Sequence, residues 1–376
     1  SSDLIGMWAC AIFDRETGRL FLCRDRFGVK PLYYRVGPQG EVGFASEIKQ
    51  LAAMPGWRPR VDGDIAYDFL VHAISDHTDR TFFAGVRQVP PGHAVEIDCN
   101  RLPARDPVLP VRCWYRLEAL PFEGGFTDAA REFRARFLEA VSLHLRSDVP
   151  VGFCLSGGLD SSAIVCAARQ LAPLAELHTF TAGSAVPRFD EQRWSRLVVD
   201  AANARPHVVE PDVDDLFRHA ATLCRTQDEP FGSTSIFAQS LVFSAARDAG
   251  IKVMLDGQGA DEQLAGYPSF FPARLAGQFR SLHWLDMLRE LRAIARTHGL
   301  GAGTSAKLVA AATLPEPAIS VLSRAAGFSM PAPDWLDTTR IGVHPRGPLC
   351  APPGRGESIS ALSRAQLCGS NLQMLL

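Results

Sequence analysis

The residues with the clearest chemical meaning run from Leu155 to Ser162 and read Leu-Ser-Gly-Gly-Leu-Asp-Ser-Ser. The two glycines let the backbone come close to a ligand, and small hydroxyl residues gather where a helix is expected to start. The free N–H groups and the dipole of a helix start favour an anion. An aspartate opposes a bare phosphate but suits one that carries Mg²⁺. The stretch therefore predicts a phosphate-binding loop, and the competing interpretation is an ordinary strand-to-helix turn with a polar cap.

Two other kinds of loop fit this stretch less well. A Walker A loop requires a lysine after its last glycine, and no lysine lies near Ser156. The nucleophile elbow of hydrolases requires a glycine two residues before the serine, where this chain has Cys154. A serine hydrolase that uses Ser156 is therefore disfavoured, although it stays an alternative.

The elements around the loop read as alternating strands and helices. Short continuous apolar runs, typical of strands buried on both faces of a parallel sheet, occur at 149–155, 177–182, 206–209 and 251–255. Helical periodicity or composition marks 127–145, 190–202 and 236–249. This alternation predicts a doubly wound α/β domain with a parallel sheet, and such sheets bind ligands at the carboxyl ends of their strands.

The first part of the chain has a different pattern. Segments of β type, separated by turn residues, occur at 7–14, 20–25 and 42–47, and the last leads into a short helix at 48–51. Residues 86–97 read as a β-hairpin with Pro90-Pro91-Gly92 as its turn, and the Pro- and Arg-rich stretch 100–116 reads as a linker. We therefore predict a β-rich domain over 1–118 and an α/β domain over 119–376. Within the second domain, 277–312 is expected to be helical, whereas the Pro- and Gly-rich stretch 313–358 shows no clear element.

Composition argues against several classes of function. The 39 Lys and Arg residues nearly balance the 41 Asp and Glu residues, and a net charge of −2 does not fit a dedicated nucleic-acid binder. No run of about 18 apolar residues predicts a membrane span, and no charged-then-apolar leader opens the chain. The nine cysteines lack the clustered spacing of zinc sites and small disulfide frameworks. We therefore expect a cytoplasmic protein with reduced thiols and without nucleic-acid or membrane partners.

Three blocks of the sequence resemble one family. Ser156–Ser162 resembles the pyrophosphate loop of the ATP-pyrophosphatase superfamily, and the wider stretch that begins at Arg146 is similar to glutamine-hydrolysing asparagine synthetases. The stretch 255–262, followed by Leu264-Ala-Gly-Tyr267, is similar to the second ATP-site loop of that family. The stretches 24–34 and 44–49 resemble the later half of its glutaminase domain.

The resemblance implies a class II (N-terminal-nucleophile) glutaminase domain, of which 1–118 would be the later half, and a synthetase domain over 119–376 that is truncated at its C-terminus. It implies ATP and Mg²⁺ as cofactors. The residues that would hold the β- and γ-phosphates of ATP are Ser156, Gly157, Gly158, Asp160 and Ser161. Those that would flank adenine and ribose, or approach the nucleotide from the last strand, are Leu155, Ala182, Asp256 and Gly257. Asp160 and Asp261 would contact Mg²⁺, and a structural role at a helix start is the alternative for Asp261.

The implied reaction is that of a glutamine-dependent C–N ligase of the asparagine synthase type. A substrate carboxylate is adenylated, pyrophosphate leaves, and ammonia then attacks the activated acyl group. The partners would be a small-molecule carboxylate and glutamine or ammonia, and the resemblance leaves a homodimer open. Asp160, Asp261 and Gln258 are the candidate catalytic residues.

The chain departs from the family pattern at three places. Gln258 stands where asparagine synthetases typically carry a glutamate that handles a proton during ammonia attack, and an amide cannot accept that proton. No Arg or Lys occurs from Thr226 to Ala246, where the family is expected to bind the amino-acid portion of aspartate. The chain begins Ser-Ser-Asp without a nucleophilic cysteine, so we expect it not to hydrolyse glutamine by itself. Two alternatives stay open: an amidotransferase relative that tailors a secondary metabolite or surface sugar, and a non-catalytic nucleotide-binding paralogue.

Overall fold

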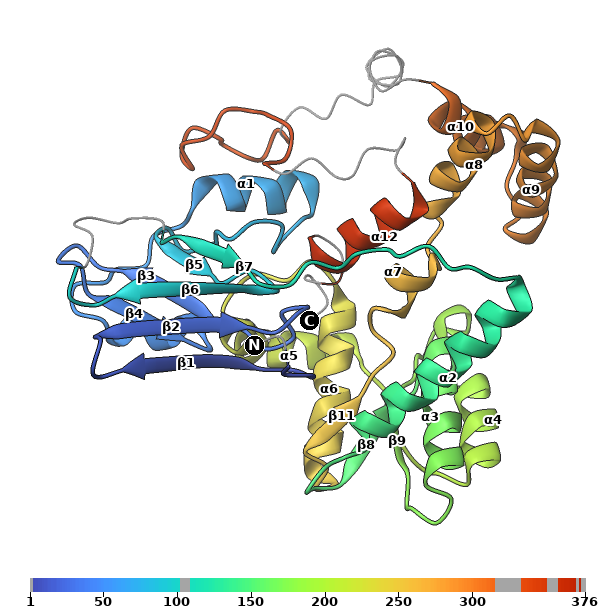
Figure 1. Cartoon of the computed structure of the whole chain (residues 1–376), viewed down its shortest axis with the longest axis horizontal. Helices are drawn as coiled ribbons and strands as arrows, with labels where there is room; N and C mark the ends of the chain where they lie inside the picture. Colours follow the sequence, from blue (N-terminus) through green and yellow to red (C-terminus); the bar gives the residue numbers. More distant parts are fainter. Residues whose placement is uncertain (1–2, 102–108, 315–332, 350–357, 370–371, 373–376) are drawn as a thin grey trace. The chain divides into compact units, whose positions relative to one another are not determined.

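The computed structural model describes residues 3–101, 109–314, 333–349, 358–369 and 372. They form two compact units (Figure 1). Unit 1 joins Ser1–Ala119 to Asp261–Leu376, and unit 2 is Leu120–Ala260. Unit 1 contains antiparallel sheets and unit 2 a parallel sheet, which confirms the predicted mixture of a β-rich part and an α/β part. The predicted domain boundary near residue 118 stays a prediction.

Unit 2 is built on a four-stranded parallel sheet whose strand order is β10-β9-β8-β11. Three strands fall within predicted apolar runs: β8 (Val151–Cys154), β9 (His178–Ala182) and β11 (Val253–Leu255). The fourth, β10 (Arg205–Val209), begins one residue before its predicted run. The helices are α2 (Phe126–His144), α3 (Leu159–Leu171), α4 (Gln192–Ala202), α5 (Val213–Gln227) and α6 (Thr234–Asp248). The predicted alternation of strands and helices is therefore confirmed.

Apolar side chains cover both faces of this sheet, which explains the continuous apolar runs. On one face, Phe153 and Leu155 pack with residues of α2, α3 and α4, which include Val141, Val165 and Ala202. On the other face, Phe180 packs with Val242 and Ala246 of α6 and with Ile251. Full burial of one such large side chain stabilises the fold by about 1.5–3 kcal/mol.

Strand β8 lies between β9 and β11, so the chain first adds strands on one side of β8 and then crosses to the other. This reversal is a topological switch point, where the loops at the carboxyl ends of neighbouring strands diverge and leave room for a ligand. The loops that follow β8 and β11 contain the two blocks singled out in the sequence.

The antiparallel part of unit 1 consists of two sheets with the orders β1-β2-β6-β7 and β4-β3-β5. The strands of the first sheet are β1 (Ala9–Asp14), β2 (Arg19–Arg24), β6 (His93–Asp98) and β7 (Val111–Cys113). Those of the second are β3 (Tyr33–Val36), β4 (Val42–Ala45) and β5 (Val86–Gln88), and the short 3-10 helix η1 (Ile48–Ala53) follows β4. One core cluster spans both sheets, because Leu22 and Val95 of the first pack with Tyr34 of the second.

Two predictions about this part are wrong. Residues 86–97 do not form a hairpin: β5 pairs with β3 and β6 pairs with β2, so Pro90-Pro91-Gly92 carries the chain from one sheet to the other. The stretch 100–116 is not a linker throughout, because β7 pairs with β6 as the fourth strand of the first sheet. Residues 102–108 of that stretch lie outside the described part. In both cases the local sequence resembles the expected element, and pairing with a distant strand decides the outcome.

In the described part of unit 1, the remaining helices are α1 (Gly63–His72), α7 (Ala260–Leu264, whose first residue belongs to unit 2), α8 (Phe270–Arg280), α9 (Trp284–Thr297), α10 (Ala302–Thr313) and α12 (Ile359–Cys368). The prediction of helix over 277–312 is confirmed, with two breaks: one between α8 and α9, where Leu282 has a φ of 59°, and one between α9 and α10, where Gly299 has a φ of 62°. Within the described residues, no helix has the length and apolarity needed to span a bilayer.

Residues 336–349, within a stretch with no clear element in the sequence, dock on α1. Arg346 is the centre of this contact: its Nη1 donates to Oδ1 of the fully buried Asp68 at 2.7 Å, and its Nη2 donates to the carbonyl oxygen of Asp64 at 3.2 Å. Its guanidinium also lies over the ring of Tyr67, 5.3 Å from the centroid. The other oxygen of Asp68 is 2.8 Å from Nε2 of His77. The segment therefore supplies the charge that compensates a buried carboxylate of α1.

Replacing Arg346 by alanine is expected to destabilise unit 1 by about 2–3 kcal/mol, because a hydrogen-bonded charge partner of the buried Asp68 is lost. The measurement is urea unfolding followed by intrinsic fluorescence. The midpoints are compared between variants whose free energy of unfolding has the same dependence on urea concentration. Arg340→Ala is the matched control, because Arg340 lies exposed in the same segment and its side chain forms no hydrogen bond or ion pair among the described residues. Equal midpoints for the two variants would contradict this prediction.

Candidate functional site

The loop after β8 takes a conformation at residue 157 that strongly favours glycine. Gly157 has a φ of +88°, in the left-handed region. A Cβ atom there would lie 2.7 Å from the backbone nitrogen of Ser195 and 2.7 Å from Cβ of Trp194, at the start of α4. Gly158, with a φ of −65°, is the N-cap of α3 and carries no capping side chain. The loop is thus pressed against α4 on one side, and its backbone leads directly into the start of a helix.

Two serines hold the loop in place. Oγ of Ser156 lies 3.1 Å from Oγ of Ser161 and accepts a hydrogen bond from the backbone N–H of Gly158 at 3.2 Å. Oγ of Ser161 also lies 3.3 Å from the carbonyl oxygen of Gly158. Ser156 is exposed whereas Ser161 is buried. The hydrogen-bond partners of Ser156 within the described residues include no histidine, which weighs further against a serine hydrolase.

The loop after β11 lies directly beside the loop after β8. A Cβ atom on Gly257 would lie 3.2 Å from the backbone nitrogen of Ser161 and 3.3 Å from Cβ of Asp160. Asp160 is in the first turn of α3, where a carboxylate interacts favourably with the helix dipole. The structure therefore brings Gly257 to the loop that contains Gly157, Gly158, Asp160 and Ser161, although that loop lies about 100 residues earlier in the sequence.

Asp256 is held by two contacts, one of which the sequence did not reveal. The backbone N–H of Gly257 donates to its Oδ1 at 2.6 Å. From β8, the thiol of Cys154 forms a side-chain hydrogen bond with the same carboxylate. Burial raises the pKa of the Cys154 thiol well above its usual range, and the neighbouring negative charge of Asp256 raises it further. Cys154 therefore stays a neutral donor that orients Asp256.

Leu155 directly follows β8, and Ala182 is the last residue of the neighbouring strand β9. The backbone N–H of Leu155 donates to the carbonyl oxygen of Phe180 at 2.9 Å, and the hydroxyl of Thr181 donates to the carbonyl oxygen of Leu155 at 2.7 Å. Leu155 is buried and Ala182 is exposed at the carboxyl end of β9. The predicted contact of these two residues with adenine and ribose stays a prediction.

The other two predicted site residues follow β11. Gln258 is exposed in the loop, as a residue that meets a substrate must be. Asp261 lies in α7 and belongs to unit 1, and its contact with Mg²⁺ stays a prediction. Next to it, the buried Glu262 accepts a hydrogen bond from the hydroxyl of Tyr267 at 3.3 Å, a contact that sequence reasoning missed. The described residues contain no group of three or more His, Cys, Asp or Glu side chains that could bind a metal.

Comparison with known proteins identifies the family. Residues 132–337, more than half of the chain, match the asparagine synthase family. The chain belongs to the asparagine synthase family. Residues 1–106 match the glutamine amidotransferase domain family, in agreement with the resemblance found in the sequence.

Curated relatives of this asparagine synthase family chain carry two kinds of name. Glutamine-hydrolyzing asparagine synthetase 3 of Bacillus subtilis is 30% identical over 73% of this chain and 46% of its own length. Asparagine synthetase 2 of the same organism is 31% identical over 70% of this chain and 36% of its own length. Amidase chyE of Penicillium rubens is 30% identical over 72% of this chain and 41% of its own length. The chain thus spans about half, or less, of the length of the curated relatives it matches.

Proposed function

We propose that the protein is an ATP-dependent amide ligase that adenylates a carboxylate, releases pyrophosphate and transfers ammonia to the activated acyl group. The observation that carries this proposal is the contact between the loops after β8 and β11, where Gly257 meets the start of α3 beside Asp160. Two glycine-rich loops that meet at a topological switch point form a cradle for a nucleotide with its phosphates at a helix start.

The residues of this cradle fit ATP with Mg²⁺. Gly158 adds no side chain in front of the N–H groups of α3, so a phosphate oxygen can reach them. Asp160 would repel a phosphate on its own, and a Mg²⁺ ion supplies the compensating charge. Hydroxide is a poor leaving group and AMP a good one, so adenylation is what makes the carboxylate reactive toward ammonia. Under this proposal glutamine is the source of ammonia in the full-length protein, through the glutamine amidotransferase domain.

A separate question is which carboxylate the protein converts into an amide. Gln258 is exposed in the second loop, and no Arg or Lys occurs from Thr226 to Ala246 to bind the charged end of aspartate. A relative named an amidase matches the chain about as well as the asparagine synthetases do. These observations favour the second candidate function, a tailoring amidotransferase that acts on a carboxylate other than aspartate.

The test is exchange of labelled pyrophosphate into ATP by the full-length protein, with a panel of carboxylates. We expect exchange that depends on one carboxylate and on Mg²⁺, and that disappears with EDTA. Asp160→Ala is expected to lower exchange at least about tenfold, because a charge-assisted interaction with the metal and phosphates is lost. Exchange that is absent with every carboxylate would favour the non-catalytic paralogue, and full exchange by Asp160→Ala would contradict the assigned site.

A further inference from the structure

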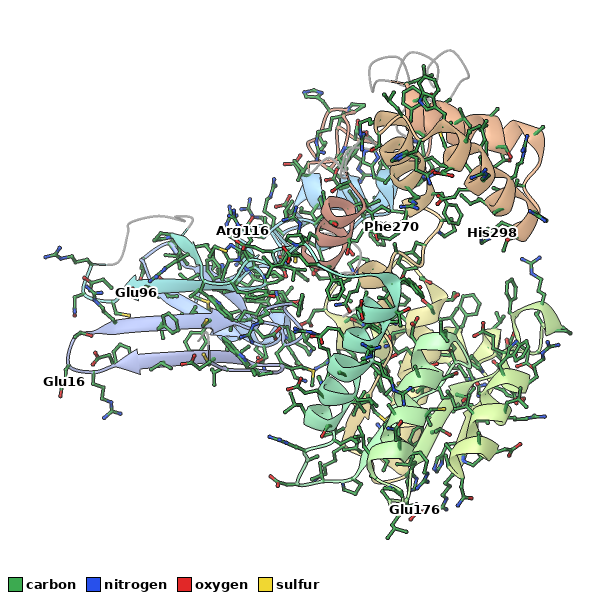
Figure 2. The ribbon with its side chains drawn as sticks, turned by 45° about the vertical axis from the view of Figure 1, so that its right-hand side comes forward. Glu16, Glu96, Arg116, Glu176, Phe270 and His298 are labelled. Carbon is green, nitrogen blue, oxygen red and sulfur yellow. The ribbon has the colours of Figure 1, made fainter. Side chains whose placement is uncertain are left out.

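A cavity lined by several arginines lies in unit 1, where the segment that follows β7 approaches α12. Its volume is about 400 Å³, which is in the range of small-molecule sites. We call it the arginine pocket. Three arginines line it: Arg26 from the loop after β2, Arg116 from the segment after β7 (labelled in Figure 2) and Arg364 from α12. No Asp or Glu is among the lining residues that the structure describes.

One face of α12 forms a wall of the pocket. The lining residues of this helix recur at the three- and four-residue spacing of a single helix face: Ala361, Arg364, Ala365 and Cys368. Two small alanines leave the space, and Arg364 reaches into it from an exposed position. Tyr115 and Leu117 add apolar surface opposite. The pocket therefore combines apolar walls with cationic groups.

The guanidinium of Arg26 is fixed in place before any ligand arrives. It lies over two aromatic rings, 5.3 Å from the centroid of Tyr115 and 5.7 Å from that of Trp114. Its Nη1 donates to the carbonyl oxygen of Leu4 at 2.5 Å. A stacked and hydrogen-bonded arginine loses little side-chain freedom when it binds an anion, which favours affinity.

The other two arginines lack compensation by acidic groups. Arg116 and Arg364 are exposed, and neither takes part in an ion pair within the described residues. Three guanidinium groups around one cavity repel each other, and an anion between them removes that repulsion. A carboxylate satisfies one arginine in the bidentate mode, whereas phosphate and pyrophosphate carry enough charge and oxygen atoms for several.

We propose that the arginine pocket binds a phosphate-bearing small molecule. The pocket lies within unit 1, whereas the loop after β8 belongs to unit 2. The residues of the pocket can bind such an anion whether or not the protein is a ligase. Pyrophosphate is the simplest probe of this chemistry.

Cysteines give a readout that is specific for the pocket. Cys113 lines it and is exposed, and its thiol donates to the carbonyl oxygen of Tyr115 at 3.2 Å. Cys368 also lines it, but burial raises the pKa of its thiol, an effect that the nearby Arg364 opposes. Cys166 and Cys224 are exposed, belong to unit 2 and do not line the pocket, so they serve as internal controls.

The experiment is alkylation of the 376-residue chain with iodoacetamide, with the rate at each cysteine followed by peptide mass spectrometry. At constant ionic strength, pyrophosphate is expected to slow alkylation of Cys113 by about fivefold or more, while Cys166 and Cys224 keep their rates. In the double variant Arg116→Gln/Arg364→Gln, the pyrophosphate concentration needed for half protection is expected to rise on the order of tenfold or more.

Arg112→Gln is the matched control for charge. Arg112 is exposed on β7 and does not line the pocket, so this variant is expected to keep the protection seen in the unmodified chain. The proposal is overturned if pyrophosphate leaves the rate at Cys113 unchanged, or if it slows all three cysteines equally. It is also overturned if citrate at the same ionic strength protects Cys113 as well as pyrophosphate does, because the pocket would then not select phosphate.

Discussion

Alanine at position 157 is expected to lower pyrophosphate exchange of the full-length protein by about 10²-fold or more. The φ of +88° at Gly157 is strained for any residue with a side chain. In addition, the new Cβ would lie 2.7 Å from the backbone nitrogen of Ser195, so the loop or the start of α4 must move. Because the loop leads into α3, this shift displaces the N–H groups that are proposed to bind the phosphates.

Gly250→Ala separates backbone strain from the collision. Gly250 has a similar φ of +78°, but a Cβ there would meet no atom within 4 Å. This control is expected to lose about 1–2 kcal/mol of stability while it keeps its exchange rate. Circular dichroism on both variants establishes that the fold persists. If Gly157→Ala keeps full exchange, the loop after β8 is not the phosphate site.

The strands of unit 2 could be predicted because their burial leaves a local signal. A strand covered on both faces needs consecutive apolar residues, as in Val151–Cys154, and the sequence shows this directly. The pairing in unit 1 has no such signal. β5 has three residues, and its partner is β3, about 50 residues earlier. The same holds for Arg346, which lies in a stretch without periodicity and whose partner Asp68 is 278 residues earlier in the chain.

The candidate site was predictable to a similar extent. Glycines at 157 and 257 mark close approaches in the structure, and their role follows from the absence of a side chain. Cys154 was missed because a cysteine inside an apolar run reads as a small hydrophobic residue, and its hydrogen bond to Asp256 depends on the alignment of β8 with β11. Trp194 was missed because its contact with the loop depends on how α4 packs.

With ammonia as the nitrogen donor, the full-length protein is expected to form asparagine at least about tenfold more slowly than it amidates its preferred carboxylate, because no Arg or Lys occurs from Thr226 to Ala246 to bind the charged end of aspartate. Gln258 is exposed in the loop after β11, where the family typically carries a glutamate. A neutral amide can donate a hydrogen bond to a substrate carboxylate before adenylation, but it cannot accept the proton that ammonia loses on attack. The measurement is a steady-state comparison of aspartate with a panel of carboxylates.

Gln258→Glu is expected to change the two half-reactions in opposite directions. A carboxylate at 258 repels the substrate carboxylate at short range, so pyrophosphate exchange should slow. The same group can accept a proton, so transfer of ammonia to a preformed acyl-adenylate should become faster, by up to about 10²-fold. Gln263→Glu adds the same charge at an exposed position on α7 and should change neither rate. If the unmodified protein forms asparagine efficiently, Gln258 is compatible with aspartate as the substrate, and the preference for another carboxylate is wrong.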